Sequence, residues 1–201
     1  MRVTSESGLR ELYSPVTGRA RLKQLGKLEK HSRNFINHSP FLVLSTSNFA
    51  GKLDSSPRGG APGFVEVLDD KTVLIPDSKG NNRIDSLINI TENSNLGCLF
   101  LIPGINETLR INGKAEIRTD SEYLEIFSSF RNQPVSVIKI EVEEVFLHCA
   151  KALMRSKLWE EESKIERSSF PTMGQMINDQ LNETSDTESQ EAMVERYRKD
   201  L

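Results

Sequence analysis

Two polar segments within residues 53–83 carry the residue types of an anion-binding site. The first, residues 55–63, places Arg58 among three glycines, which tolerate positive φ angles and let a ligand approach the backbone. The second, residues 76–83, ends in a Gly-Asn-Asn-Arg turn that brings donor groups and the Arg83 guanidinium to the expected start of a helix. Together these groups would bind a phosphate. The alternative is that both segments are ordinary turns with solvated charges.

An expected β-hairpin lies between the two segments. Residues 64–68 and 72–75 are rich in β-branched and large apolar types, and an Asp-Asp-Lys turn joins them. After the second segment, apolar positions recur at the spacing of an amphipathic helix. No Gly-Lys-Ser/Thr follows the glycine-rich segment, and no Gly-x-Gly-x-x-Gly opens a strand-turn-helix unit, so the sequence argues against a P-loop or a Rossmann site.

The order and spacing of these residues resemble the FMN-binding split-barrel superfamily, and within it the branch called pyridoxamine 5'-phosphate oxidase-like. The resemblance spans roughly residues 10–180. It is carried by residues 54–65, 68–70, 75–77, 80–83, 85–87, 99–104, 107–113, 148–152 and 155–159. The resemblance implies a noncovalently bound FMN and a homodimer with flavin sites at the subunit interface.

Transferred to matching positions, the resemblance implies two groups of cofactor-binding residues. Those expected at the phosphate and along the polar edge of the ring are Ser56, Arg58, Ile75, Pro76, Asp77, Lys79, Asn81 and Arg83. Those expected to close the ring slot, from the same or the partner subunit, are Arg155, Lys157 and Trp159. For the second group the alternative is a cationic helix with its tryptophan packed on the barrel. Because the flavin itself accepts and returns a hydride, no catalytic acid or base is assigned.

The expected function is an FMN-dependent oxidoreductase with a small-molecule electron donor and acceptor. A true pyridoxamine phosphate oxidase is disfavoured, because the Arg-x-His motif of that enzyme is missing. A non-catalytic flavin or haem binder is the alternative from another class, and His148 is the one strand histidine that could ligate haem. Cys149 is interpreted as a structural thiol rather than a redox centre.

Composition bounds the remaining possibilities. The chain has 201 residues, 36% of them hydrophobic and 27% charged, which suits a soluble domain. A net charge of −3 gives no case for nucleic-acid binding, and no apolar run suggests a membrane span or a signal peptide, so we expect a cytoplasmic protein. Two cysteines and three histidines, without metal-ligand spacing, predict no metal site.

The pattern of strands and helices predicts a mainly β fold, a six- to seven-stranded antiparallel split β-barrel with flanking helices. A barrel domain is expected over residues 1–181 and a helical extension over residues 182–201. Further strands are expected at residues 41–46, 96–102, 107–118 and 135–149. Gly113, in the middle of the third of these, indicates a bulge or a close contact. Further helices are expected at residues 18–38, at 151–166, at 173–181 and from residue 185 onward.

Overall fold

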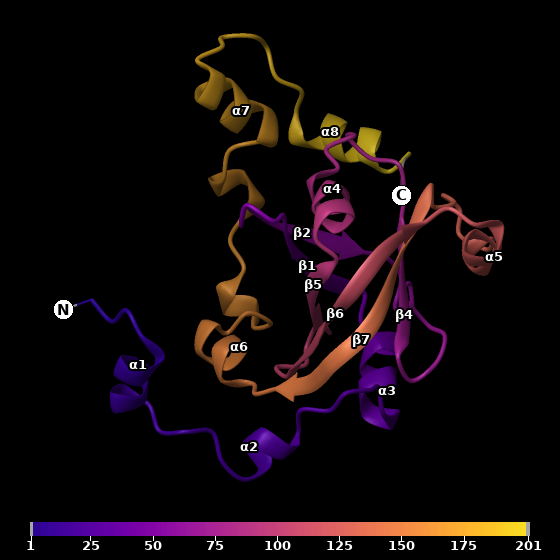
Figure 1. Ribbon diagram of the computed structural model, residues 1–201. Helices are drawn as coiled ribbons and strands as arrows, with labels where there is room; N and C mark the ends of the chain where they lie inside the picture. Colours follow the sequence, from indigo (N-terminus) through magenta and orange to yellow (C-terminus); the bar gives the residue numbers. More distant parts are fainter. Residues whose placement is uncertain (1, 200–201) are drawn as a thin grey trace.

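The computed structural model describes residues 2–199 and contains one seven-stranded antiparallel sheet in the order β2-β1-β5-β6-β7-β4-β3 (Figure 1). The strands are β1 Phe41–Ser47, β2 Leu53–Gly59, β3 Glu66–Val67, β4 Thr72–Asp77, β5 Asn95–Leu101, β6 Thr108–Arg118 and β7 Ser136–His148. The α-helices are α1 Glu6–Leu12, α2 Arg19–Leu22, α3 Lys30–His38, α4 Asp85–Glu92, α5 Ser121–Leu124, α6 Lys151–Ser156, α7 Met173–Leu181 and α8 Gln190–Tyr197. The predicted strand number, antiparallel pairing and flanking helices are confirmed.

The core lies on one face of this sheet. Along β1, Leu42, Leu44 and Thr46 are buried, whereas the residues between them are more exposed, because successive side chains of a strand point to opposite faces. In register with them, Cys98 and Phe100 of β5 face the same interior. The α3 helix adds apolar side chains to this core through its own buried face.

The glycine-rich segment differs from the prediction, because its first half is a strand rather than a loop. Residues Leu53–Gly59 form β2, which pairs only with β1 and is therefore an edge strand. Pro57 is compatible with this position, since an edge strand can leave a backbone nitrogen without a ladder partner. The loop begins at Gly60, where an added Cβ would lie 2.7 Å from the Cβ of Phe64. The predicted hairpin is present as β3 and β4.

The predicted bulge in β6 is confirmed. The register between β6 and β7 shifts between Asn112 and Gly113. A Cβ on Gly113 would lie 2.1 Å from the carbonyl oxygen of Glu141, so only glycine allows the two backbones to approach this closely.

Three predicted helices begin or end elsewhere. The expected helix over residues 18–38 is two helices, because residues 23–29 are not helical and Leu25 forms a β-bridge with Val145. The expected helix from residue 151 ends at Ser156, where Lys157 takes the left-handed conformation with φ of 52°. The last helix is capped by Ser189 rather than by residue 185.

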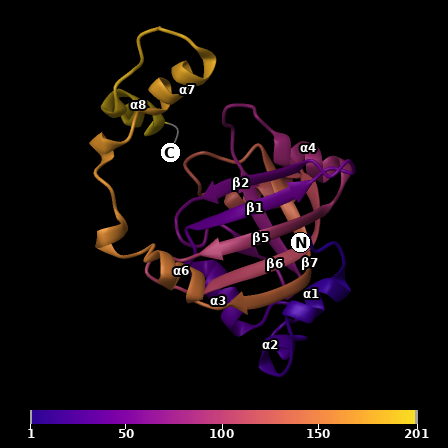
Figure 2. The same ribbon diagram turned by 90° about the vertical axis from the view of Figure 1, so that its left-hand side faces the viewer.

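The terminal helices stand apart from the core. None of α1, α2, α6, α7 and α8 contains a buried residue. Figure 2 shows α7 and α8 on an arm that extends away from the sheet. The two-domain division at residue 181 stays a prediction. No helix within residues 2–199 combines the length and apolar character needed to cross a bilayer.

Candidate functional site

The sheet leaves an open seam between β2 and β4. Strand β3 pairs only with Val73 and Leu74, so the last residues of β4 have no strand neighbour on that side. Across this seam the Nη2 atom of Arg58 in β2 lies 3.4 Å from the Oδ1 atom of Asp77 at the end of β4. Both side chains are 20% exposed, so the pair is screened less than a surface salt bridge.

A row of polar side chains on β2 continues from this ion pair into the seam. Asp54, Ser56 and Arg58 alternate along the strand and face the same side as the buried residues of β1. Arg58 Nη1 donates to Ser56 Oγ at 2.9 Å, and Ser56 Oγ lies 2.8 Å from the Oγ of Ser86 in α4. Ser86 in turn donates to Asp54. We call Asp54, Ser56, Arg58, Asp77 and Ser86 the seam cluster.

The seam cluster contains one unsatisfied donor and one perturbed acid. The Nε atom of Arg58 is buried and has no hydrogen-bond partner among residues 2–199, although buried N–H groups are nearly always paired. Burial raises the pKa of Asp77, and the Arg58 guanidinium opposes this shift. The Nε–H group of Arg58 is therefore available to an acceptor, and burial disfavours the charged form of the Asp77 carboxylate that faces it.

The helix α4 begins beside the seam cluster without a side-chain cap. Its N-cap residue is Ile84, which makes no capping hydrogen bond, so backbone N–H groups of the first turn remain available. The turn before it is stabilised internally, because the Arg83 backbone N–H donates to Asn81 Oδ1 at 2.9 Å. The Arg83 side chain is 80% exposed, and its Nε atom donates to Asp85 Oδ2 at 2.7 Å.

A second concave feature, which we call the α6 groove, lies on the opposite face of the sheet. It encloses about 500 Å³ between α6 and the outer faces of β1, β5, β6 and the end of β7. The lining residues are Ser45, Gly97, Cys98, Leu99, Leu101, Thr108, Arg110, Asn112, His148, Cys149, Ala152 and Leu153. It therefore combines an apolar floor with a few polar groups, as ligand pockets commonly do.

A family model described as pyridoxamine 5'-phosphate oxidase matches residues 28–149, which include all seven strands. The chain belongs to this family. No curated protein matches the chain.

Solved structures of other proteins are similar to this chain. HupZ from Group A Streptococcus is 21% identical, with 60% of this chain and 93% of HupZ covered and a TM-score of 0.50. General Stress Protein 26 from Bacillus anthracis is 20% identical, with 57% and 88% covered and a TM-score of 0.44. An FMN-binding protein from Syntrophomonas wolfei is 11% identical, with 58% and 88% covered and a TM-score of 0.45. The fold of this family member is a split β-barrel.

Within this barrel the first predicted group of site residues is only partly brought together. Ser56, Arg58 and Asp77 join in the seam cluster. Ile75 is fully buried in the core, so only its backbone is available to a ligand, and it is followed by the half-buried Pro76. The three residues of the turn, Lys79, Asn81 and Arg83, are exposed at the mouth of the seam.

The second predicted group lies elsewhere in the chain. Trp159 Nε1 donates to the carbonyl oxygen of Ile105 at 3.0 Å, which fixes it to the β5–β6 turn of the same chain. Lys157 forms an ion pair with Glu162, and Arg155 is exposed on α6. Within residues 2–199, neither a hydrogen bond nor an ion pair joins these three side chains to the seam cluster.

Two members of the seam cluster were missed from the sequence. Asp54 shares the alternation of Ser56 and Arg58, which would have indicated it once β2 was recognised as a strand. Ser86 has no comparable signal, because its contact with Ser56 joins residues 30 positions apart.

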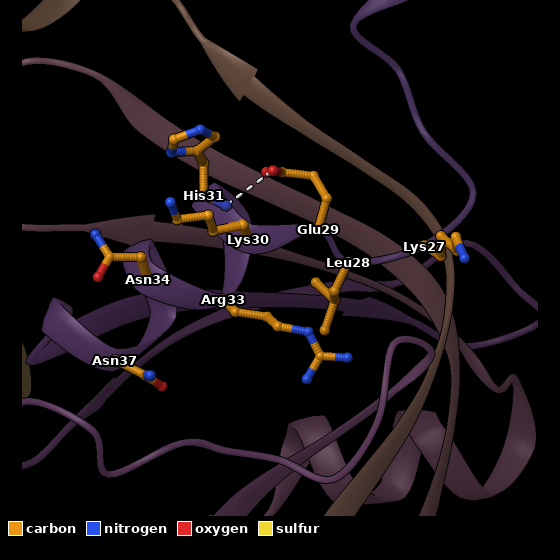
Figure 3. Close-up of a pocket in the computed structure, with 8 residues that line it drawn as sticks. All are labelled: Lys27, Leu28, Glu29, Lys30, His31, Arg33, Asn34 and Asn37. Atoms are coloured by element: carbon orange, nitrogen blue, oxygen red, sulfur yellow. Dashed lines mark hydrogen bonds between the residues drawn. The ribbon is translucent and has the colours of Figure 1, made fainter.

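A depression of about 910 Å³ beside α3 is a weaker candidate. It runs along α3, and Figure 3 shows its side chains spreading outward, with His31 and Arg33 pointing to different sides. The carboxylate of Glu29 already accepts from the backbone N–H groups of His31 at 2.8 Å and Ser32 at 2.7 Å, so this helix start offers few free donors. Within residues 2–199, no cluster of His, Cys, Asp and Glu could hold a metal ion.

Proposed function

We propose that this protein is an FMN-binding oxidoreductase that works with a small-molecule electron donor and acceptor. Membership of the pyridoxamine 5'-phosphate oxidase family supports a flavin, and a solved neighbour is described as an FMN-binding protein. The observation that carries the proposal is the buried, unpartnered Nε atom of Arg58, next to two hydroxyl groups and the uncapped start of α4. This donor set suits the terminal phosphate of FMN.

The seam cluster would hold the phosphate and orient the cofactor. Arg58 would supply charge-assisted hydrogen bonds, and the hydroxyl groups of Ser56 and Ser86 would donate further ones. The phosphate would replace the Asp77 carboxylate as the partner of Arg58. Arg83 at the exposed mouth would contribute long-range attraction more than binding energy. When bound, the flavin would supply hydride acceptance and return, so the protein's part is binding, orientation and exclusion of competing reactions.

The proposed assembly is a homodimer with flavin sites at the subunit interface. The terminal helices favour this arrangement, because α7 leaves Met173, Ile177 and Leu181 exposed in a single chain. An exposed apolar stripe of this kind is typical of a surface that another chain covers. Arg155, Lys157 and Trp159 would then complete the ring slot from one subunit or the other. We propose the cytoplasm as the location.

The experiment that tests the proposed function is a visible spectrum of the purified protein before and after FMN is added, followed by anaerobic NADH or NADPH. Flavin bands that bleach with a nicotinamide would support a reductase. A protein that neither carries nor takes up flavin would refute the proposal. Sedimentation of the same sample tests the homodimer.

A non-catalytic haem or flavin binder is the second candidate. One observation favours haem, because His148 is exposed at the α6 groove, next to an apolar floor. A Soret band on haem addition that His148→Ala removes would support it. A true pyridoxamine phosphate oxidase is disfavoured by the missing Arg-x-His motif.

A further inference from the structure

The α6 groove is lined by apolar side chains below and above, and the space between them is not filled by the core. Leu99 and Leu101 face outward from β5, and Leu153 descends from α6 above them. The three side chains are half-buried rather than buried, so apolar surface remains open to a ligand. A volume of about 500 Å³ is large enough for a small organic molecule.

One cation is fixed at the edge of this floor. Arg110 pairs with Leu99 on one side and with Phe146 on the other in the strand register. Its guanidinium carbon lies 5.1 Å from the centre of the Phe146 ring, so the side chain is stacked rather than free to rotate through water. Stacking on the ring face leaves the N–H groups at the guanidinium edge available for an anion.

Arg110 has no carboxylate partner within residues 2–199. The nearest acid on the neighbouring strand, Glu144, accepts a hydrogen bond from Asn112 Nδ2 at 3.0 Å instead. An oriented guanidinium without a counter-ion, beside a half-buried apolar surface, matches a ligand that is apolar at one end and anionic at the other.

We propose that the α6 groove binds a small amphipathic carboxylate, with its apolar body on Leu99, Leu101 and Leu153 and its carboxylate on Arg110. A carboxylate is favoured over a phosphate, because the planar guanidinium fork pairs with one planar acid group, and Lys23, the other cation over the Phe146 ring, already donates to the carbonyl oxygen of Leu147. His148 at the rim offers an additional donor. Binding here requires neither flavin nor the seam cluster, which lies on the other face of the sheet.

The test uses 2-naphthoate as the probe and 2-naphthamide as its neutral analogue, with the full-length protein and isothermal titration calorimetry. The informative variant is Arg110→Gln. The matched control is Lys114→Gln, which removes one positive charge from the same strand outside the groove lining. A third variant, Ala152→Phe, fills the groove from α6 without altering its charge.

We expect wild-type protein and Lys114→Gln to bind 2-naphthoate at least about tenfold more tightly than 2-naphthamide, as a charge-assisted hydrogen bond would give. Arg110→Gln should remove this preference, and Ala152→Phe should weaken both probes. Equal affinities of wild-type protein for the two probes, or a preference that survives in Arg110→Gln, would overturn the proposal. So would the absence of 2-naphthoate binding at millimolar concentration. A circular dichroism spectrum identifies any variant that has not folded.

Discussion

Replacing Arg58 by glutamine should separate recognition of the flavin phosphate from recognition of the flavin ring. Arg58 is 20% exposed and offers a buried N–H group without an acceptor, so a phosphate would gain charge-assisted hydrogen bonds there. Loss of a charged hydrogen bond costs about 1.5–3 kcal/mol, which is roughly a 10- to 150-fold loss of affinity. Riboflavin, which lacks the phosphate, should bind wild-type and variant proteins alike.

The assay is quenching of flavin fluorescence, titrated with FMN and with riboflavin. The matched control is Arg83→Gln, because Arg83 is 80% exposed and already paired with Asp85, so its removal should cost at most about 1 kcal/mol. The double variant Arg58→Gln with Asp77→Asn avoids leaving a buried carboxylate unpaired. The seam cluster would lose its assigned role if Arg58→Gln bound FMN like wild type, or if it lost FMN and riboflavin affinity in equal measure.

Three further predictions concern other groups. Because burial raises the pKa of Asp77, FMN should bind more tightly as pH falls through that pKa, and Asp77→Asn should remove this part of the pH dependence measured by titration at several pH values. Gly113→Ala should destabilise the fold by roughly 2–4 kcal/mol in urea unfolding, because its Cβ would meet a β7 carbonyl oxygen. Burial raises the pKa of Cys98 to about 12, so a thiol reagent should modify the exposed Cys149 and spare Cys98 until the protein unfolds.

Local sequence patterns predicted most of the strands, because burial on one face imposes a period of two. The alternation of Leu109, Ile111 and Ala115 marked β6, and the position of Gly113 marked its bulge. The apolar run at residues 41–46 predicted β1 to within one residue. These features depend on near neighbours in the chain, and sequence reasoning is strongest for them.

The candidate site was harder to predict, because its contacts join distant segments. The strand character of β2 was hidden by Ser, Pro and Gly, whose low β-propensity is outweighed by pairing with β1. Helix ends depended on tertiary contacts as well, since Leu25 bridges to Val145 in a segment where apolar spacing favours a helix. The Ser56–Ser86 contact was set by how α4 meets β2.

The ion pair across the seam would allow the proposed phosphate site to stay ordered when no ligand is bound. An unpaired guanidinium at this depth would be costly, and Asp77 supplies the opposite charge at 3.4 Å. The same carboxylate is itself held unfavourably, because burial raises its pKa. The pair is therefore sufficient to stabilise the seam and weak enough to be replaced by a phosphate. It follows that Asp77→Asn should bind FMN more tightly than wild type. Without FMN, the variant should hold the Arg58 side chain less firmly than wild type does. NMR of the Arg58 Nε–H group, with and without FMN, measures the order of this side chain directly.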